Sequence, residues 1–139
     1  MRRRPPGVDA EPARDDAVDP VGGGPAGATA ARAAALAGRR VQLLDRARFP
    51  RNKPCGGAIS MRALRRFPYL TDALSRIPAR RLSRLYLEAP SGGSVTLTSH
   101  APAALMVRRV EFDALLLDLA REAGVDVVEG VEVSRARVR

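Results

Sequence analysis

Three glycines near the start of the chain have the spacing of a dinucleotide-binding turn. Gly22, Gly24 and Gly27 fit the pattern G-x-G-x-x-G, and Asp45 closes a second apolar run 23 residues after Gly22. In this pattern the first glycine permits a tight turn, the second lets the backbone approach a pyrophosphate, and the third lets a helix lie close to the sheet. A carboxylate at the end of the second strand accepts hydrogen bonds from ribose hydroxyls. The spacing therefore predicts a dinucleotide site.

A strand, a helix and a second strand must position these residues. We expect the strand at 17–21, an alanine-rich helix at 25–37 that opens with Pro25 and Ala26 and stops at Gly38, and a buried strand at 40–45. The unpaired N–H groups and the positive dipole end at the start of this helix favour an anion. Arg46, next to Asp45, suits a ribose 2′-phosphate, so an NAD(P)-binding Rossmann module stays open as an alternative. A non-catalytic remnant that keeps part of the fold is a third interpretation.

The composition excludes several classes of protein. The 139 residues carry a formal net charge of +9, but Lys53 is the single lysine, the arginines are spread over every segment, and 4% of the residues are aromatic. Dispersed charge with few aromatic residues argues against binding of nucleic acid. Cys55 and His100 are each alone, so we predict no intrachain disulfide and no metal site. The absence of a long apolar run and of an apolar leader predicts a cytoplasmic protein.

The remaining segments predict an α/β fold with an insertion. Residues 1–15 are predicted to form a disordered tail, and residues 16–139 a partial FAD/NAD(P)-binding domain. After a polar loop at 46–57 we expect helices at 60–67 and 71–76, then a β-hairpin at about 80–99 whose runs start at Leu82 and include Val95 and Leu97. The apolar spacing from Phe112 to Ala123 predicts a helix, followed by a strand at 125–128. The result is a Rossmann-like βαβ unit with an inserted hairpin.

Three runs together carry a resemblance to a known family. They are Gly22-Gly23-Gly24-Pro25-Ala26-Gly27, Lys53-Pro54-Cys55-Gly56-Gly57-Ala58-Ile59-Ser60 and Val107-Arg108-Arg109-Val110-Glu111-Phe112-Asp113. From about Asp16 to its end the chain resembles the N-terminal part of the geranylgeranyl reductase family of FAD-dependent oxidoreductases. The resemblance implies bound FAD, a small-molecule isoprenoid substrate whose carbon–carbon double bonds are reduced, and electrons from NAD(P)H or another donor. It also leaves open a peripheral membrane contact made through the lipid substrate.

The resemblance also assigns roles to individual residues. It implies that the glycine run, with Pro25 and Ala26, holds the pyrophosphate, that Asp45 meets the adenosine ribose, with Arg46 beside it as a further cofactor-binding candidate, and that Arg109 contacts the cofactor near its pyrophosphate or ribityl portion. The loop with Lys53, Gly56 and Gly57 would lie at the flavin ring, with Cys55 on the substrate side as the catalytic candidate. The alternatives are a small buried cysteine and a solvated arginine beside Arg108. Phe112 and Asp113 are expected to serve packing and the helix start.

Two features depart from the family pattern. Asp19 and Pro20 fall in the expected first strand, where a central parallel strand has buried aliphatic residues and where a buried carboxylate and a missing N–H are both costly. The chain also ends before the later Gly-Asp motif of these enzymes and before most of a substrate domain. We therefore expect a truncated family member, for which a separate C-terminal half is a conceivable partner.

Overall fold

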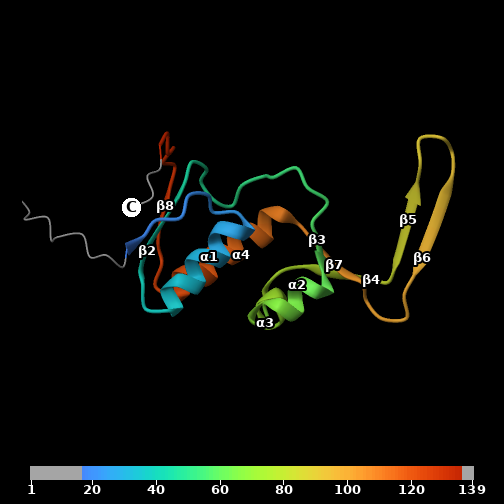
Figure 1. Ribbon diagram of the computed structural model, residues 1–139, viewed down its shortest axis with the longest axis horizontal. Coiled ribbons are helices and arrows are strands. Elements are labelled where there is room, and N and C mark those ends of the chain that lie inside the picture. The colour runs from blue at the N-terminus through green and yellow to red at the C-terminus, as the bar shows by residue number, and fades with distance from the viewer. Residues whose placement is uncertain (1–16, 136–139) are drawn as a thin grey trace, which may run out of the picture.

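The computed structural model describes residues 17–135. Its first layer is a small parallel sheet. Its strands lie in the order β1-β2-β8, all parallel, and comprise β1 (Ala17–Val18), β2 (Arg40–Asp45) and β8 (Asp126–Glu129). Helices α1 (Pro25–Leu36) and α4 (Arg109–Glu122) pack against each other, α1 also against β2 and α4 against β8 (Figure 1). The predicted α/β fold with a βαβ unit is confirmed, whereas the tail predicted at 1–15 lies outside the described residues.

Small and aliphatic side chains hold this layer together. In α1 the fully buried residues are Ala28 and Ala31, which lets the helix lie close to its neighbours, and Gly38 follows the helix with a φ of +81°. In α4 the predicted apolar face, which includes Leu116 and Ala120, is buried as expected. Leu117, on another side of α4, is also fully buried, so this helix is covered on more than one face.

The first strand is shorter than the predicted 17–21. β1 ends at Val18, and pairing with β2 resumes in a single bridge from Val21 to Leu44. Pro20 has no N–H to donate to β2, which accounts for the interruption. Asp19 is exposed, so the expectation of a costly buried carboxylate at this position is wrong for the described chain.

A second layer was missed by the sequence analysis. It is an antiparallel sheet in the order β3-β7-β4, formed by β3 (Ala58–Ser60), β7 (Ala104–Val107) and β4 (Ala79–Leu82). The predicted helix at 60–67 is α2 (Met61–Arg66), whose first turn is capped by the Ser60 hydroxyl, which accepts from the N–H of Ala63 at 3.2 Å. The helix predicted at 71–76 is α3 (Tyr69–Ala73) followed by one 3₁₀ turn, η1 (Leu74–Arg76).

The predicted hairpin forms, but it starts later than expected. It consists of β5 (Arg84–Glu88) and β6 (Ser94–Thr98), and it projects from the rest of the molecule (Figure 1). Leu82 was assigned to its first run but belongs to β4, which pairs with β7. The pairs Leu85 with Leu97 and Leu87 with Val95 share one face, and all four side chains are exposed. Within residues 17–135, no helix is long and apolar enough to cross a membrane.

Candidate functional site

Contacts within the chain account for two of the three glycines of the G-x-G-x-x-G pattern, which lies between β1 and α1. Gly22 has a φ of +101°, and its N–H donates to the Leu44 carbonyl at 2.7 Å. A Cβ on Gly27 would lie 1.8 Å from the Gly22 carbonyl oxygen, so a side chain there cannot be accommodated without moving the helix. As the pattern predicts, Gly27 lets α1 approach the turn that follows the first strand.

Gly24 is different because its surroundings are open. It is the N-cap of α1, with φ −74° and ψ −178°, a conformation that any residue adopts. The one described atom within 4 Å of a Cβ on Gly24 would be Arg51 Nη2, at 3.6 Å, which is ordinary contact. Packing in the described chain therefore does not require glycine here, and this is the position at which the pattern expects a pyrophosphate.

The N-terminus of α1 is electrostatically prepared for an anion. In the described region no side chain caps it, no acidic residue occupies its first turn, and Pro25 begins the helix. Because the first N–H groups of a helix have no carbonyl acceptor within the helix, those of Ala26 and Gly27 are available to a ligand. Together with the helix dipole they favour a phosphate.

Asp45, at the carboxyl end of β2, is largely occupied by its own chain. The residue is 8% exposed, and its Oδ2 accepts from the N–H of Gly23 at 2.5 Å while Oδ1 accepts from the N–H of Ala47 at 2.7 Å. These bonds fix the glycine turn to the end of β2, a role that the sequence did not indicate. Each oxygen keeps a further lone pair, so contact with a ribose stays a prediction. The neighbouring Arg46 is exposed.

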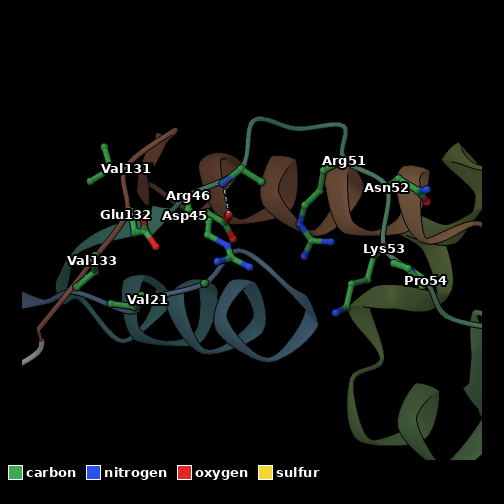
Figure 2. A pocket seen from close by; sticks show the side chains of 12 residues that line it. Val21, Asp45, Arg46, Arg51, Asn52, Lys53, Pro54, Val131, Glu132 and Val133 are labelled. Atoms are coloured by element: carbon green, nitrogen blue, oxygen red, sulfur yellow. Dashed lines mark hydrogen bonds between the residues drawn. The ribbon is translucent and has the colours of Figure 1, made fainter.

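A cleft of about 630 Å³ opens beside this carboxylate (Figure 2). In Figure 2 the side chains of Arg51 and Lys53 extend from the loop after β2 toward α1, and Glu132 lies across the cleft from them. Four residues of the predicted set line it: Gly22, Asp45, Arg46 and Lys53. Others in the lining are Val21, Ala47, Arg51, Asn52, Pro54, Val131, Glu132 and Val133.

A second, apolar cavity of about 360 Å³ is lined by four more of the predicted site residues, Pro25, Cys55, Gly57 and Arg109. Its remaining lining is mostly apolar: Thr29, Ala58, Ile59, Ser60, Ala63, Phe67, Leu70, Val107, Phe112 and Leu116. Gly57 has a φ of +76°, and a Cβ there would lie 1.9 Å from the Val107 carbonyl oxygen. The close backbone approach at Gly57 is thus made to β7, whereas Gly56 is exposed and has open space around it.

Cys55 is exposed, so its interpretation as a small buried residue is wrong. The backbone N–H of Gly57 and, next, the guanidinium of Arg109 favour the thiolate and lower the pKa of the Cys55 thiol below its ordinary value. The thiolate, which is the nucleophilic form, is therefore favoured at the edge of the apolar cavity.

The buried carboxylate of Asp113 forms ion pairs with one arginine that lines the cleft and one that lines the apolar cavity. Asp113 is 0% exposed, and it accepts from Arg109 Nε at 2.7 Å and Arg109 Nη2 at 2.9 Å. Arg51 Nη2 lies 3.1 Å from the same carboxylate. Arg109 is therefore not a solvated arginine. Asp113 was expected to serve the helix start, but it lies one turn into α4 and is the ion-pair partner of Arg109. Arg51 and this role of Asp113 were missed, although the i, i+4 spacing of Arg109 and Asp113 is a signal for such a pair.

The residues present fit a dinucleotide. Gly24 leaves the approach to α1 open, and no acidic side chain caps that helix end in the described part of the chain. Arg51 Nη1 is buried and has no hydrogen-bond partner among residues 17–135. A buried guanidinium N–H without an acceptor is costly, and the guanidinium that carries it lies beside Gly24, with Nη2 3.6 Å from a Cβ at that position.

Comparison with known proteins agrees with this geometry. The model of the family described as FAD dependent oxidoreductase matches residues 20–139. A geranylgeranyl diphosphate reductase of Rhodobacter capsulatus is 39% identical over 110 residues, which are 79% of this chain and 27% of that protein. A menaquinone reductase of Mycobacterium tuberculosis is 34% identical over 125 residues, which are 85% of this chain and 30% of that protein.

A solved structure shares the fold. The geranylgeranyl bacteriochlorophyll reductase-like protein of Thermoplasma acidophilum aligns with a TM-score of 0.71 and 28% identity, over 83% of this chain and 30% of that one. The present chain thus spans less than a third of the length of each of these three proteins.

Proposed function

Because the chain belongs to the FAD-dependent oxidoreductase family, we propose that its cleft holds the adenosine and pyrophosphate half of FAD. The observation that carries this proposal is the contrast between two glycines of one turn. A Cβ on Gly27 would lie 1.8 Å from a carbonyl oxygen, whereas a Cβ on Gly24, at the start of α1, would make only an ordinary contact of 3.6 Å with Arg51 Nη2. A pyrophosphate at Gly24 explains why the open position is also glycine.

The remaining site residues take their proposed roles from this placement. Asp45 and Arg46 meet the adenosine ribose in the cleft, and Lys53 adds positive charge at its edge. The flavin end of the cofactor lies toward the apolar cavity, where Arg109 and Cys55 face it. The exposed Gly56 leaves room for a flat ring against the backbone.

We propose an isoprenoid substrate for the complete enzyme of which this chain forms the FAD-binding part. Geranylgeranyl diphosphate reductase and menaquinone reductase both act on molecules that contain isoprenoid chains, and the apolar lining beside Cys55 suits such a chain. FAD bound there and reduced by NAD(P)H, the proposed source of electrons, would supply a hydride to a carbon–carbon double bond, and a proton would complete the reduction. The exposed thiol of Cys55 lies where it can contact the substrate or move a proton.

Three further expectations stay proposals. They are a separate C-terminal half that completes the substrate site, a peripheral membrane contact through a lipid substrate, and a cytoplasmic location. The NAD(P)-binding module is less well supported than FAD, because the matched family is FAD dependent. Exposed Arg46 is the feature that favours NADP.

Flavin titration of the purified chain tests the proposed function. We expect saturable binding of FAD, strongly weakened in Gly24→Val because the new side chain occupies the pyrophosphate position. Gly93→Val is the matched control, since Gly93 lies in the hairpin turn, has open space around it and has no positive φ. The proposal fails if the parent chain binds no FAD, or if Gly24→Val binds FAD as tightly as Gly93→Val while both remain folded. Tighter binding of NADP than of FAD would favour the NAD(P) module.

A further inference from the structure

We propose that Arg51 binds the FAD pyrophosphate and that Asp113 is the positioning residue that holds its guanidinium beside the start of α1. This inference rests on the proposed function, since it assigns a contact within the same site. It concerns a residue that lies outside the glycine pattern, 27 residues after Gly24. The side chain reaches the site because the loop after β2 passes above α1 (Figure 2).

The position of the guanidinium supports this role. Arg51 Nη2 would be 3.6 Å from a Cβ on Gly24, so the charged group lies against the open side of the N-cap. The side chain is 19% exposed and lines the cleft. Its Cζ lies 4.9 Å from the centroid of the Phe49 ring, and this stacking supports the guanidinium from another side.

The charge balance around Asp113 also favours an anion. The buried carboxylate is shared by Arg51 and Arg109, which leaves one net positive charge on the three groups. Two guanidiniums screen the carboxylate from the cleft, so it does not repel a phosphate. The helix dipole and the Lys53 ammonium add to this positive charge, and a pyrophosphate diester carries two negative charges.

Unmet hydrogen-bonding capacity distinguishes the two arginines. Arg109 uses both Nε and Nη2 on Asp113 and lines the apolar cavity with Cys55. Arg51 touches Asp113 through Nη2, and its buried Nη1 lacks an acceptor among the described residues. A phosphate oxygen at Gly24 would lie beside this guanidinium, because its Nη2 would be 3.6 Å from a Cβ on that glycine. Arg51, rather than Arg109, is therefore the arginine assigned to the pyrophosphate.

Calorimetric titration with FAD, ADP and adenosine tests this assignment. Adenosine lacks phosphate, and its weak binding can be followed by NMR shifts. Loss of one hydrogen bond to a charged group predicts that Arg51→Gln weakens FAD and ADP about 10- to 100-fold and leaves adenosine unchanged. Arg51→Lys should show a smaller loss for the same two ligands, because it keeps the charge but not the planar fork. Arg65→Gln, on the exposed side of α2, is the control for charge loss and should change none of them.

Each result separates this inference from the proposed function. If the parent chain binds FAD and Arg51→Gln binds ADP equally well, Arg51 has no phosphate contact and the FAD site still stands. An equal loss for adenosine and ADP would mean that Arg51 acts through the fold, which also overturns the assignment. Should Arg51→Gln not fold, as judged by its melting curve, Arg51→Lys decides by the ratio of ADP to adenosine affinity.

Discussion

Replacement of Asp113 by asparagine should cause a large loss of stability. The side chain is 0% exposed and holds two guanidiniums, of Arg109 at 2.7 and 2.9 Å and of Arg51 at 3.1 Å. Asparagine keeps the volume but removes the charge, and one of the oxygens becomes an NH₂ group that faces N–H donors. Breaking a buried ion pair from one side costs about 3–5 kcal/mol. We expect a loss of that size, a large share of the roughly 5–15 kcal/mol of a typical domain.

The same helix offers a matched control. Asp118 also pairs with an arginine, since its Oδ1 lies 2.9 Å from Arg121 Nη1, but the two side chains are 61% and 42% exposed. Exposed pairs contribute about 0–1 kcal/mol, so Asp118→Asn should be nearly neutral. The two variants make the same chemical change on one helix and differ in burial.

Urea unfolding followed by circular dichroism measures both losses without added flavin. With a slope of about 1–3 kcal/mol per molar urea, the midpoint of Asp113→Asn should fall by at least about 1 M, while that of Asp118→Asn stays near the parent. Equal midpoints for the two variants would refute the argument, because the burial of Asp113 would then contribute nothing to the stability of the ion pair.

Other replacements separate packing, thiol chemistry and strand pairing. Gly27→Ala, whose Cβ would lie 1.8 Å from a carbonyl oxygen, should lose about 1–3 kcal/mol or more in thermal melting, whereas Gly24→Ala should lose much less; equal losses would contradict the assigned contacts. Alkylation of Cys55 by iodoacetamide should have its pH midpoint below that of an ordinary cysteine, because the pKa of the thiol is lowered, and the midpoint should move upward in Arg109→Gln, since the arginine favours the thiolate; an unmoved midpoint would exclude that effect. Pro20→Val should gain no more than about 0.5–1.5 kcal/mol in chemical denaturation, because it restores one N–H at a partly exposed strand; a gain of several kcal/mol would indicate a central buried strand.

Local patterns were sufficient for the βαβ unit. The glycine spacing, Gly38 after α1 and the apolar face of α4 each report a contact made within a few residues or along one helix, and the structure has these elements close to the predicted bounds. The resemblance to geranylgeranyl reductases, carried by the loop with Cys55, agrees with the family match and with the relatives.

Long-range pairing was beyond what the sequence could indicate. β3 and β7 are three and four residues long and stabilise each other across more than 40 positions, so neither shows enough alternation to be recognised alone. The burial of Asp113 was hidden for a similar reason. One of its partners, Arg51, lies on a distant loop, and a carboxylate on a helix usually faces solvent.

The pairing of β8 with β2 has a consequence for how the chain is made. Gln42 in β2 and Asp126 in β8 are paired and lie 84 positions apart in the sequence. The end of β2 and the loop after it, which line the cleft, are also hydrogen-bonded to residues that follow Asp126. Val131 donates to the Asp45 carbonyl at 3.0 Å, and the Glu129 carboxylate accepts from the N–H of Phe49. At about 5–20 residues per second, a ribosome needs roughly 4–17 s to add those 84 residues. During that interval the nascent chain contains every glycine of the nucleotide turn but lacks β8 and the residues after it that line the cleft.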